Sequence, residues 1–311
     1  MPTNTFTPPA AQQRLTAAII GLGSIGGVAA GCLAAIGRHD VIACARKPIE
    51  KLTLDQPDGT VEMPLRALTD PTRAEPVDWV LLCTKAYQTE SAAPWLARLC
   101  APSTRVAVLQ NGIDHVARVS PLANGATVIP VIVYYNGERL APDHVRLRQG
   151  ASSDFVVAND AAGRAFAQLF AGTPLRVQLG NDFVTLAWRK LLINAIASPI
   201  TALTLQRQAI LRRADVRELS LALLDEAIAV GRAEGAKLAD DEGARTLATL
   251  FTFSGELGTS MYFDRLAGRP LEVEALTGAI VAAGARHGIA TPLNSALLTL
   301  LRAINDGAQR G

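Results

Sequence analysis

The fold of this 311-residue chain is decided by one stretch near its beginning, Ala17-Ala18-Ile19-Ile20-Gly21-Leu22-Gly23-Ser24-Ile25-Gly26-Gly27. Its apolar start predicts a strand at Ala17–Ile20, and the G-x-G-x-x-G run leads into a predicted helix at Ser24–Ile36. In such a unit Gly21 permits the tight turn, Gly23 lets the backbone approach a pyrophosphate, and Gly26 allows close packing of helix on strand. The helix N-terminus adds unpaired N–H groups and a partial positive charge. We therefore expect a dinucleotide here, bound by Gly21, Gly23, Ser24, Ile25 and Gly26.

The next segments continue the alternation of short apolar strands with helices, up to about Leu179. Further strands are predicted at Val41–Ala45, Trp79–Cys83 and Arg105–Leu109, a helix at Thr89–Leu99, and sheet extensions at Thr127–Tyr135 and Asp154–Val157. This βαβ alternation implies a parallel sheet with right-handed crossovers.

Past Asn181 the pattern becomes helical. Apolar residues near a 3.6-residue period predict helices at Asp182–Ala197, Asp215–Glu234, Glu242–Phe253, Glu272–His287 and Ser295–Ile304. Pro199 is interpreted as the breaker after the first of them. The prediction is an α/β chain: a Rossmann-type, doubly wound domain over residues 14–181, followed by an all-helical domain over 182–311. Residues 1–13, polar and proline-bearing, are predicted to form a disordered leader.

Composition narrows the class of protein. The chain is 49% hydrophobic and 19% charged with a formal net charge of +2, which is typical of a globular protein. It has no long basic stripe for nucleic acid and no apolar run of the ~20 residues that span a bilayer. Its four cysteines, Cys32, Cys44, Cys83 and Cys100, lie mostly in apolar runs, as expected of reduced thiols in a cytoplasmic protein. We expect no metal site.

The end of the second predicted strand indicates which nicotinamide cofactor is bound. NAD enzymes usually place Asp or Glu there to bind the ribose 2′-hydroxyl. This chain has Arg46 and Lys47 instead. Arg46 can pair bidentately with a 2′-phosphate, which favours NADP. The alternative is that both are solvated loop charges.

Polar residues also follow two later strands of the predicted sheet. Lys85 lies in Thr84-Lys85-Ala86-Tyr87-Gln88, and Asn111 lies in Gln110-Asn111-Gly112. Ligands of open α/β sheets bind at the carboxyl ends of strands. We therefore expect Lys85 and Asn111 near the nicotinamide, although each alone is compatible with an ordinary surface residue or turn.

The helical half contributes a second set of candidates. Lys190 and Asn194 are four residues apart and share one helix face. If Lys190 faces a cleft, desolvation lowers its pKa toward a range useful for a proton donor; if not, it reaches the surface along its apolar stem. Ser260 follows later, and Glu272, taken alone, is compatible with a first-turn acid that complements the helix dipole.

Taken in order, these segments resemble the ketopantoate reductases, the NADPH-dependent 2-dehydropantoate 2-reductases, from about Leu15 to Ile304. The matching segments are GLGSIGG, Arg46, TKAYQ, QNG, WRKLLINAIASPITAL, and SM followed by GRPLEVE. The resemblance implies a two-domain fold with the active site in the cleft and NADPH-dependent reduction of a 2-oxo acid, ketopantoate first among them.

The resemblance also implies a role for each candidate. Lys190 is implied to be the catalytic lysine, and Glu272 the carboxylate that holds the substrate's hydroxyl side. Lys85 and Asn111 are implied to border the nicotinamide and the substrate, while Asn194 and Ser260 contact the substrate. The partner expected is a small 2-oxo acid, with a homodimer as the assembly.

Two departures from the family pattern bear on the substrate. The family usually has a second asparagine one turn beyond Asn194, where this chain has Ser198 before Pro199. Its usual T-E-I-D is here Leu271-Glu272-Val273-Glu274. Because a serine hydroxyl reaches less far than an amide, reduction of a different 2-oxo acid or ester stays open. A rival of another class is a non-catalytic NADP(H)-binding regulator on the same fold.

Overall fold

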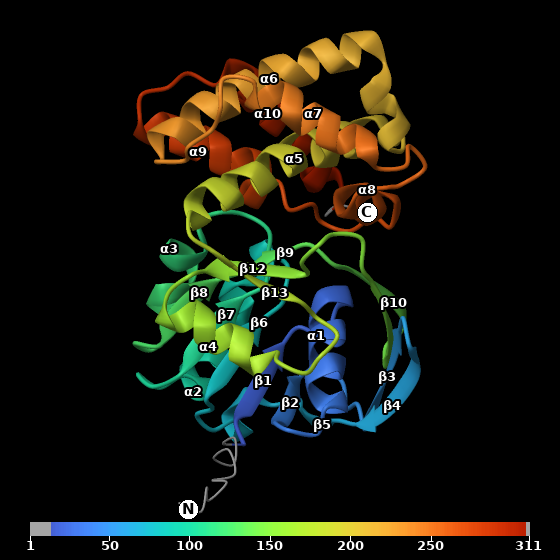
Figure 1. Cartoon of the computed structure of the whole chain (residues 1–311), viewed down its shortest axis with the longest axis vertical. Coiled ribbons are helices and arrows are strands. Elements are labelled where there is room, and N and C mark those ends of the chain that lie inside the picture. The colour runs from blue at the N-terminus through green and yellow to red at the C-terminus, as the bar shows by residue number, and fades with distance from the viewer. Residues whose placement is uncertain (1–13, 309–311) are drawn as a thin grey trace, which may run out of the picture.

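Six parallel strands form the central sheet of the N-terminal part of the molecule (Figure 1). The structure is a computed structural model that describes residues 14–308, so the predicted leader lies outside it. The strand order is β5-β2-β1-β6-β7-β8. The bounds are β1 Thr16–Ile20, β2 Asp40–Cys44, β5 Arg66–Leu68, β6 Trp79–Leu82, β7 Arg105–Val108 and β8 Thr127–Pro130. The first four predicted strands are thus confirmed to within one residue at each end.

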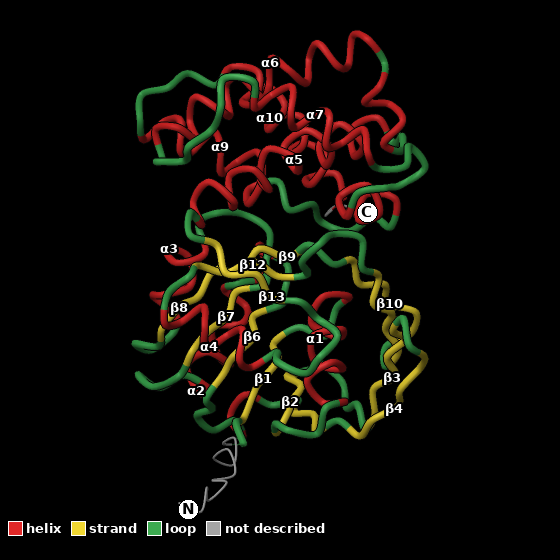
Figure 2. Tube along the Cα trace, viewed as in Figure 1, coloured by secondary structure: helices red, strands yellow, loops and turns green. Residues whose placement is uncertain are grey.

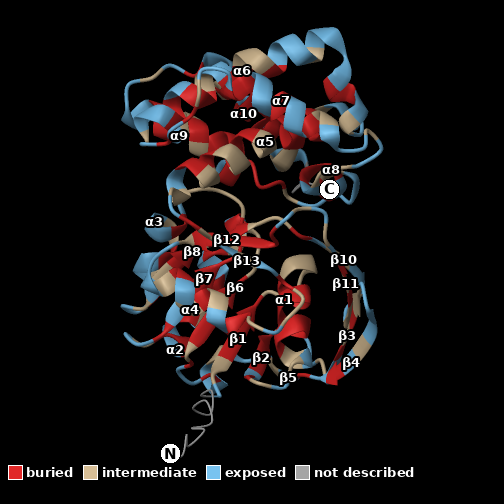
Figure 3. Ribbon diagram, viewed as in Figure 1, coloured by how far each residue is buried: buried red, intermediate tan, exposed pale blue. Residues whose placement is uncertain are grey.

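Helices cover both faces of this sheet, as expected of a doubly wound domain. Side chains of β1 alternate between two apolar clusters, with Ala17 and Ile19 in the cluster that includes α1 (Ser24–Ala35). Ala18 and Ile20 lie in the cluster that includes α2 (Ala93–Leu99). Each fully buried Leu, Ile or Phe contributes ~1.5–3 kcal/mol relative to an exposed one. Figure 3 shows the strands of this sheet as buried.

Two smaller sheets complete the N-terminal part, and the sequence pattern did not predict them. One has the order β10-β11-β3-β4, joins segments about ninety residues apart, and packs on α1. The other, β13-β12-β9, contains the predicted strand at Asp154–Val157, so that strand does not extend the central sheet. The bounds are β3 Lys51–Gln56, β4 Gly59–Pro64, β9 Ile132–Val133, β10 Asn136–Ala141, β11 His144–Arg148, β12 Phe155–Ala158 and β13 Val177–Gly180, with the short helices α3 His115–Val119 and α4 Ala161–Leu169 between strands.

The rest of the described chain is helical and has its own apolar core (Figure 2). Its helices are α5 Phe183–Thr204, α6 Ala214–Ala233, α7 Glu242–Thr252, α8 Ser260–Leu266, α9 Ala279–Arg286 and α10 Pro292–Ala308. The predicted α/β sheet followed by helices is confirmed. The prediction that Pro199 ends the first helix is wrong, because α5 continues through it for five further residues. None of the helices within residues 14–308 has the length and hydropathy of a membrane span.

Candidate active site

The glycine-rich turn has the geometry that a bound pyrophosphate requires. Gly21 has φ +97°, a conformation that favours glycine, and a Cβ at Gly26 would lie 1.9 Å from the Gly21 carbonyl oxygen. A Cβ at Gly23 would meet nothing within 4 Å, so the space before α1 is open. The start of α1 has neither a side-chain cap nor an acidic residue in its first turn. Its N–H groups are therefore available to an anion, and these residues fit a dinucleotide.

Arg46 lies at the same sheet edge as this turn. β1 and β2 are parallel neighbours in which Ile20 aligns with Cys44, so Gly21 and Arg46 follow strands that end together. The Arg46 side chain is exposed. This placement leaves its guanidinium free to meet a phosphate at the open end of β2.

The two loops that carry Lys85 and Asn111 are tied together by Gln110. Its side-chain amide donates to Thr84 Oγ1 at 3.0 Å, after β6, and its carbonyl accepts from Arg118 Nη2 at 3.0 Å. Gln110 is only 7% exposed, so these bonds form away from bulk water. The carboxyl ends of β6 and β7 are thereby held in register, which fixes the positions of Lys85 and Asn111.

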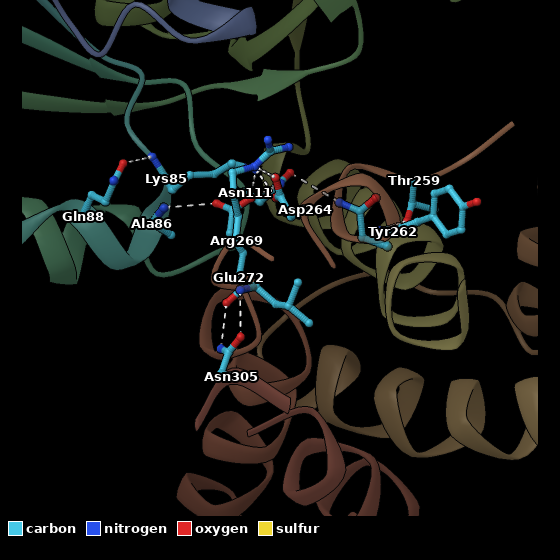
Figure 4. Close-up of polar contacts among 12 residues, drawn as sticks. Lys85, Ala86, Gln88, Asn111, Thr259, Tyr262, Asp264, Arg269, Glu272 and Asn305 are labelled. Atoms are coloured by element: carbon cyan, nitrogen blue, oxygen red, sulfur yellow. Dashed lines mark hydrogen bonds and ion pairs between the residues drawn. The ribbon is translucent and has the colours of Figure 1, made fainter. Parts of the chain in front are cut away.

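The carboxylate of Glu272 is where the two parts of the molecule meet (Figure 4). Its Oε1 accepts from the backbone N–H of Ala86 at 3.0 Å. Its Oε2 accepts from Lys85 Nζ at 3.2 Å and from Asn111 Nδ2 at 3.1 Å. Asn194 Nδ2 from α5 reaches Asn111 Oδ1 at 3.5 Å. Four predicted site residues, Lys85, Asn111, Asn194 and Glu272, thus form one connected network.

Glu272 does not lie in the first turn of a helix, as the sequence pattern alone had suggested. The helical segment begins two residues later as a π-helical turn, η6 (Glu274–Gly278), which leads directly into α9. A π-type hydrogen bond from Gly278 N–H to the Val273 carbonyl, at 2.8 Å, defines this turn. The carboxylate consequently accepts protein hydrogen bonds across the cleft instead of capping its own helix.

Lys85 has a second carboxylate partner that the sequence analysis did not assign. Asp264, on α8, lies 2.7 Å from Lys85 Nζ and also accepts from Arg269 Nε at 2.9 Å. Burial alone would lower the pKa of Lys85, but the carboxylates of Glu272 and Asp264 together outweigh it and raise the pKa. Lys85 therefore stays charged and links the two parts of the molecule through these two ion pairs.

Lys190 has a different environment. It lies on α5, one turn before Asn194, and is half-buried. Its ammonium is 5.0 Å from the centre of the Tyr134 ring. Burial lowers the pKa of Lys190 to about 8, and within the described residues no carboxylate counteracts this effect. A lysine of this kind is protonated near neutral pH yet releases its proton readily.

The two remaining candidates, Ser198 and Ser260, lie on α5 and at the start of α8. Ser198 is one turn beyond Asn194 on the same helix and is only 3% exposed. Ser260 begins α8 and is exposed. The two regions are joined by Thr201 and Thr259, whose hydroxyl oxygens lie 2.8 Å apart. Ser198 and Ser260 thus flank a contact between α5 and α8.

A cavity of about 500 Å³ opens beside the Glu272 segment. It is lined by Ala86 and Tyr87 on one side and by Arg302 and Asn305 of α10 on the other. Neither Lys190 nor Asn194 is among its lining residues. Ala86 and Glu272 line the cavity and are also hydrogen-bonded to each other in the network, so the cavity adjoins the candidate site at Glu272 but does not reach Lys190.

Tyr134 and Asp264 are the contributors that the sequence analysis missed. Asp264 follows Ser260 by four residues, a spacing that places both on one helix face and was the available signal. Tyr134 and Tyr135 end a predicted strand, where alternation sends one ring inward and the other outward. Nothing in the sequence indicates that the outward ring meets Lys190, because that contact joins segments far apart in the chain.

Comparisons with known proteins agree with this architecture. Residues 17–159 match the family model described as ketopantoate reductase PanE/ApbA, and residues 182–305 match the model of its C-terminal part. The chain is 40% identical to a 2-dehydropantoate 2-reductase of Caulobacter vibrioides, over 92% of this chain and 98% of that protein. It is also 40% identical to one of Mycobacterium tuberculosis, over 93% and 98%.

Solved structures give the same result. A ketopantoate reductase of Ralstonia eutropha JMP134 is 30% identical with a TM-score of 0.85, covering 95% of this chain and 100% of that one. A dimeric ketopantoate reductase of Staphylococcus aureus is 25% identical with a TM-score of 0.83, covering 94% and 100%. A D-mandelate dehydrogenase, 22% identical with a TM-score of 0.84 over 95% and 100%, shares the fold alone. Matches over both parts of the chain show that it belongs to the ketopantoate reductase family.

Proposed function

We propose that this protein catalyses the NADPH-dependent reduction of a small 2-oxo acid to the 2-hydroxy acid, with 2-dehydropantoate (ketopantoate) as the first candidate substrate. Residues 14–181 would bind the cofactor and residues 182–311 would supply Lys190 and Glu272. The observation that carries this proposal is that a half-buried lysine lies next to a network of amide and carboxylate groups. A lysine on α5 that has no carboxylate partner among the described residues lies one turn from Asn194, and the Asn194–Asn111–Glu272 network crosses to the nucleotide-binding part.

Lys190 acts in this scheme as the proton donor. The reduced nicotinamide, when bound, supplies the hydride that adds to the C2 carbonyl carbon. The Lys190 ammonium donates a hydrogen bond to the carbonyl oxygen, stabilises the negative charge that develops there, and transfers its proton to the resulting alkoxide. The lowered pKa of about 8 suits this task because a lysine with an ordinary pKa holds its proton too tightly.

Glu272 and the asparagines orient the substrate. A carboxylate offers about four acceptor positions, and three of those on Glu272 are taken by Ala86 N–H, Lys85 and Asn111. The remaining position can accept the hydroxyl of a 2-oxo acid such as ketopantoate. Asn111 and Asn194 lie between that carboxylate and Lys190 along the network, where amides can align the carbonyl for attack.

The choice of NADPH over NADH rests on Arg46. It follows β2 at the edge where the 2′-position of the adenosine ribose arrives in this fold, and no acidic residue lies between Cys44 and Lys47. A guanidinium binds a phosphate bidentately, whereas a 2′-hydroxyl gives it no charged partner.

We also propose a cytoplasmic location and a homodimeric assembly. The four cysteines are free thiols, which suits a cytoplasmic location. The Staphylococcus aureus ketopantoate reductase is described as dimeric, and we propose a homodimer here as well. Sedimentation at twice the mass of one chain would support that assembly, and sedimentation at the mass of one chain would refute it.

The test is oxidation of NADPH with a panel of 2-oxo acids: ketopantoate, 2-oxoisovalerate, which lacks the distal hydroxyl, and an aryl 2-oxo acid. If Glu272 accepts the hydroxyl, ketopantoate should exceed 2-oxoisovalerate in kcat/KM by about ten- to a hundredfold, the value of a hydrogen bond to a charged group. A higher kcat/KM for another acid would identify a paralogue with a different substrate. Oxidation that never exceeds background with any acid, while NADPH still binds, would instead indicate a regulatory protein.

A further inference from the structure

We propose that Tyr134 is the positioning residue for Lys190, holding its ammonium against the face of an aromatic ring from the opposite part of the molecule. This inference rests on the proposed function of Lys190 as proton donor. Tyr134 itself donates no proton to the reaction and is assigned no contact with substrate.

The contact has the geometry of a cation–π interaction. Lys190 Nζ lies 5.0 Å from the centre of the Tyr134 ring, within the ~6 Å over which the ring attracts a cation. Tyr134 lies between β9 and β10 in the nucleotide-binding part, whereas Lys190 lies on α5 of the helical part. The contact therefore crosses the cleft at the point where chemistry is proposed.

The ring is held in place by its neighbours. The Tyr134 backbone N–H donates to the Asp154 carbonyl at 2.9 Å. The next residue, Tyr135, is buried, donates its hydroxyl to the Ile25 carbonyl at 2.7 Å, and packs edge-on against Phe155 with ring centres 5.3 Å apart. With the chain anchored on both sides, Tyr134 presents a fixed surface to the lysine.

An aromatic face serves here where a carboxylate would not. Lys85, in the same cleft, shows what carboxylate partners do to a lysine. They raise its pKa, and Lys85 stays charged. No carboxylate in the described chain raises the pKa of Lys190, and burial lowers it to about 8. A ring orients the ammonium with a weaker attraction than an ion pair, so the lysine is positioned and remains able to release its proton.

The other charged groups around Lys190 are already paired. Arg189, its neighbour on α5, forms a salt bridge with Glu242 at 2.8 Å. Asp264 and Glu272, in the same helical part as Lys190, both bind Lys85 across the cleft. Tyr134 is thus the one group in the described chain that the structure places directly against the Lys190 ammonium.

The first test is the titration of Lys190 in cofactor-free protein, using competitive acetylation by acetic anhydride and peptide mass spectrometry. The variants are Tyr134→Leu, which removes the π face, and Tyr134→Phe, which keeps it. Loss of the ring disfavours the charged form, so in Tyr134→Leu the midpoint of Lys190 reactivity should fall by roughly 0.4 to 1.5 pH units. Tyr134→Phe should titrate like the natural protein. An unchanged or raised midpoint in Tyr134→Leu would overturn the proposal.

The second test uses turnover. Tyr134→Leu should lower kcat by about three- to thirtyfold near neutral pH, move the basic limb of its pH profile downward, and leave KM for NADPH unchanged. Tyr134→Phe should restore both kcat and the profile. Equal losses in the two variants would contradict a role for the ring. Absence of turnover in the natural protein would refute the proposed function instead, and the acetylation result would still stand on its own.

Discussion

Lys190 is kept charged in a half-buried position where that charge opposes folding. Its pKa in the folded chain, about 8, is below its usual value of 10.5, so between these values the unfolded chain binds more protons. The folded state is therefore penalised in full below about pH 8, and the penalty disappears as pH rises past 10.5. This is the pattern expected where a side chain is retained for chemistry and not for stability.

The substitution Lys190→Met tests both the catalytic role of the lysine and its cost to stability. We expect kcat to fall at least ~10²-fold, because a proton donor is lost from the transition state. We also expect the variant to be more stable by roughly 1–2 kcal/mol at neutral pH, a value discounted for partial exposure, with no gain above pH 10.5. Lys237→Met, at an exposed lysine, is the control and should change neither quantity appreciably. Near-normal turnover in Lys190→Met would remove the lysine from the mechanism.

Arg46 gives a prediction about cofactor choice. Arg46→Ala should weaken NADPH binding by about ten- to a hundredfold and leave NADH binding unchanged, because only NADPH carries the phosphate. Lys47→Ala, at the adjacent cation, is the matched control and should have the smaller effect. Binding is measured by titrating the protein with each cofactor. Equal loss of affinity for both cofactors would show that Arg46 does not recognise the phosphate.

Site residues could be predicted from the sequence only where a local sequence pattern indicates them. The turn at Gly21 follows from glycine spacing, and its φ of +97° agrees with the predicted tight turn. The pairing of Lys85 with Asp264, by contrast, joins residues 179 apart in the chain. No local pattern encodes such a contact, so Lys85 was nominated without its partner.

At the scale of elements, α5 shows how tertiary packing overrides a local signal. Proline in a helix interior removes one hydrogen bond and usually breaks the helix. Here Pro199 is buried in the helical core, between Ser198 and Ile200, and packing holds the helix through it to Thr204. The consequence is that Lys190, Asn194 and Ser198 follow one another at successive turns of a single unbroken helix.

That geometry gives the prediction for Ser198. In the family pattern an asparagine at this turn would grip the polar end of ketopantoate, and its replacement by serine should weaken saturation. Ser198→Asn should therefore lower KM for ketopantoate about three- to hundredfold, with kcat nearly unchanged. Ser198→Ala is the control and should leave KM nearly as it is if the hydroxyl has no role. A micromolar KM in the natural protein, unimproved by asparagine, would show that this position does not select the substrate.

The smaller sheets escaped prediction for a physical reason. β3 and β4 form a hairpin through a two-residue turn at Pro57-Asp58, but β3 also pairs in parallel with β11 from a distant segment. Such pairing is specified by what packs on α1, where the Gly27 position touches Val145 of β11. The strands of the central sheet that alternate with helices along the chain were predictable, whereas its edge strand β5 and the sheet beside it were not predicted.

At the scale of the whole molecule, the two parts have separate apolar cores and meet through a set of polar contacts, beside which Ile113 packs on the helical core. The buried members of the helical core all lie between Trp188 and Leu301. The bonds described across the cleft are those of Glu272 with Lys85, Ala86 and Asn111, of Lys85 with Asp264, and of Asn194 with Asn111. Polar interfaces of this kind permit relative motion of domains more readily than apolar ones. The cleft is thus closed by the same side chains that are proposed to bind the substrate.

The ion pair between Lys85 and Asp264 should therefore contribute to the stability of the whole molecule and not only to the geometry of the site. Asp264 is 5% exposed and faces two cations, so Asp264→Asn removes the nearer of the two carboxylates that bind the partly buried Lys85 and the carboxylate partner of the exposed Arg269. We expect the free energy of unfolding in urea to fall by roughly 1–3 kcal/mol, below the value for a fully buried pair because Lys85 is partly exposed. The control is Arg302→Gln, which breaks an exposed pair with Glu274 inside the helical part and should change stability by less than about 0.5 kcal/mol. Equal losses in the free energy of unfolding for the two substitutions would mean that the ion pair across the cleft stabilises the molecule no more than an exposed pair does. Other contacts would then hold the two parts together.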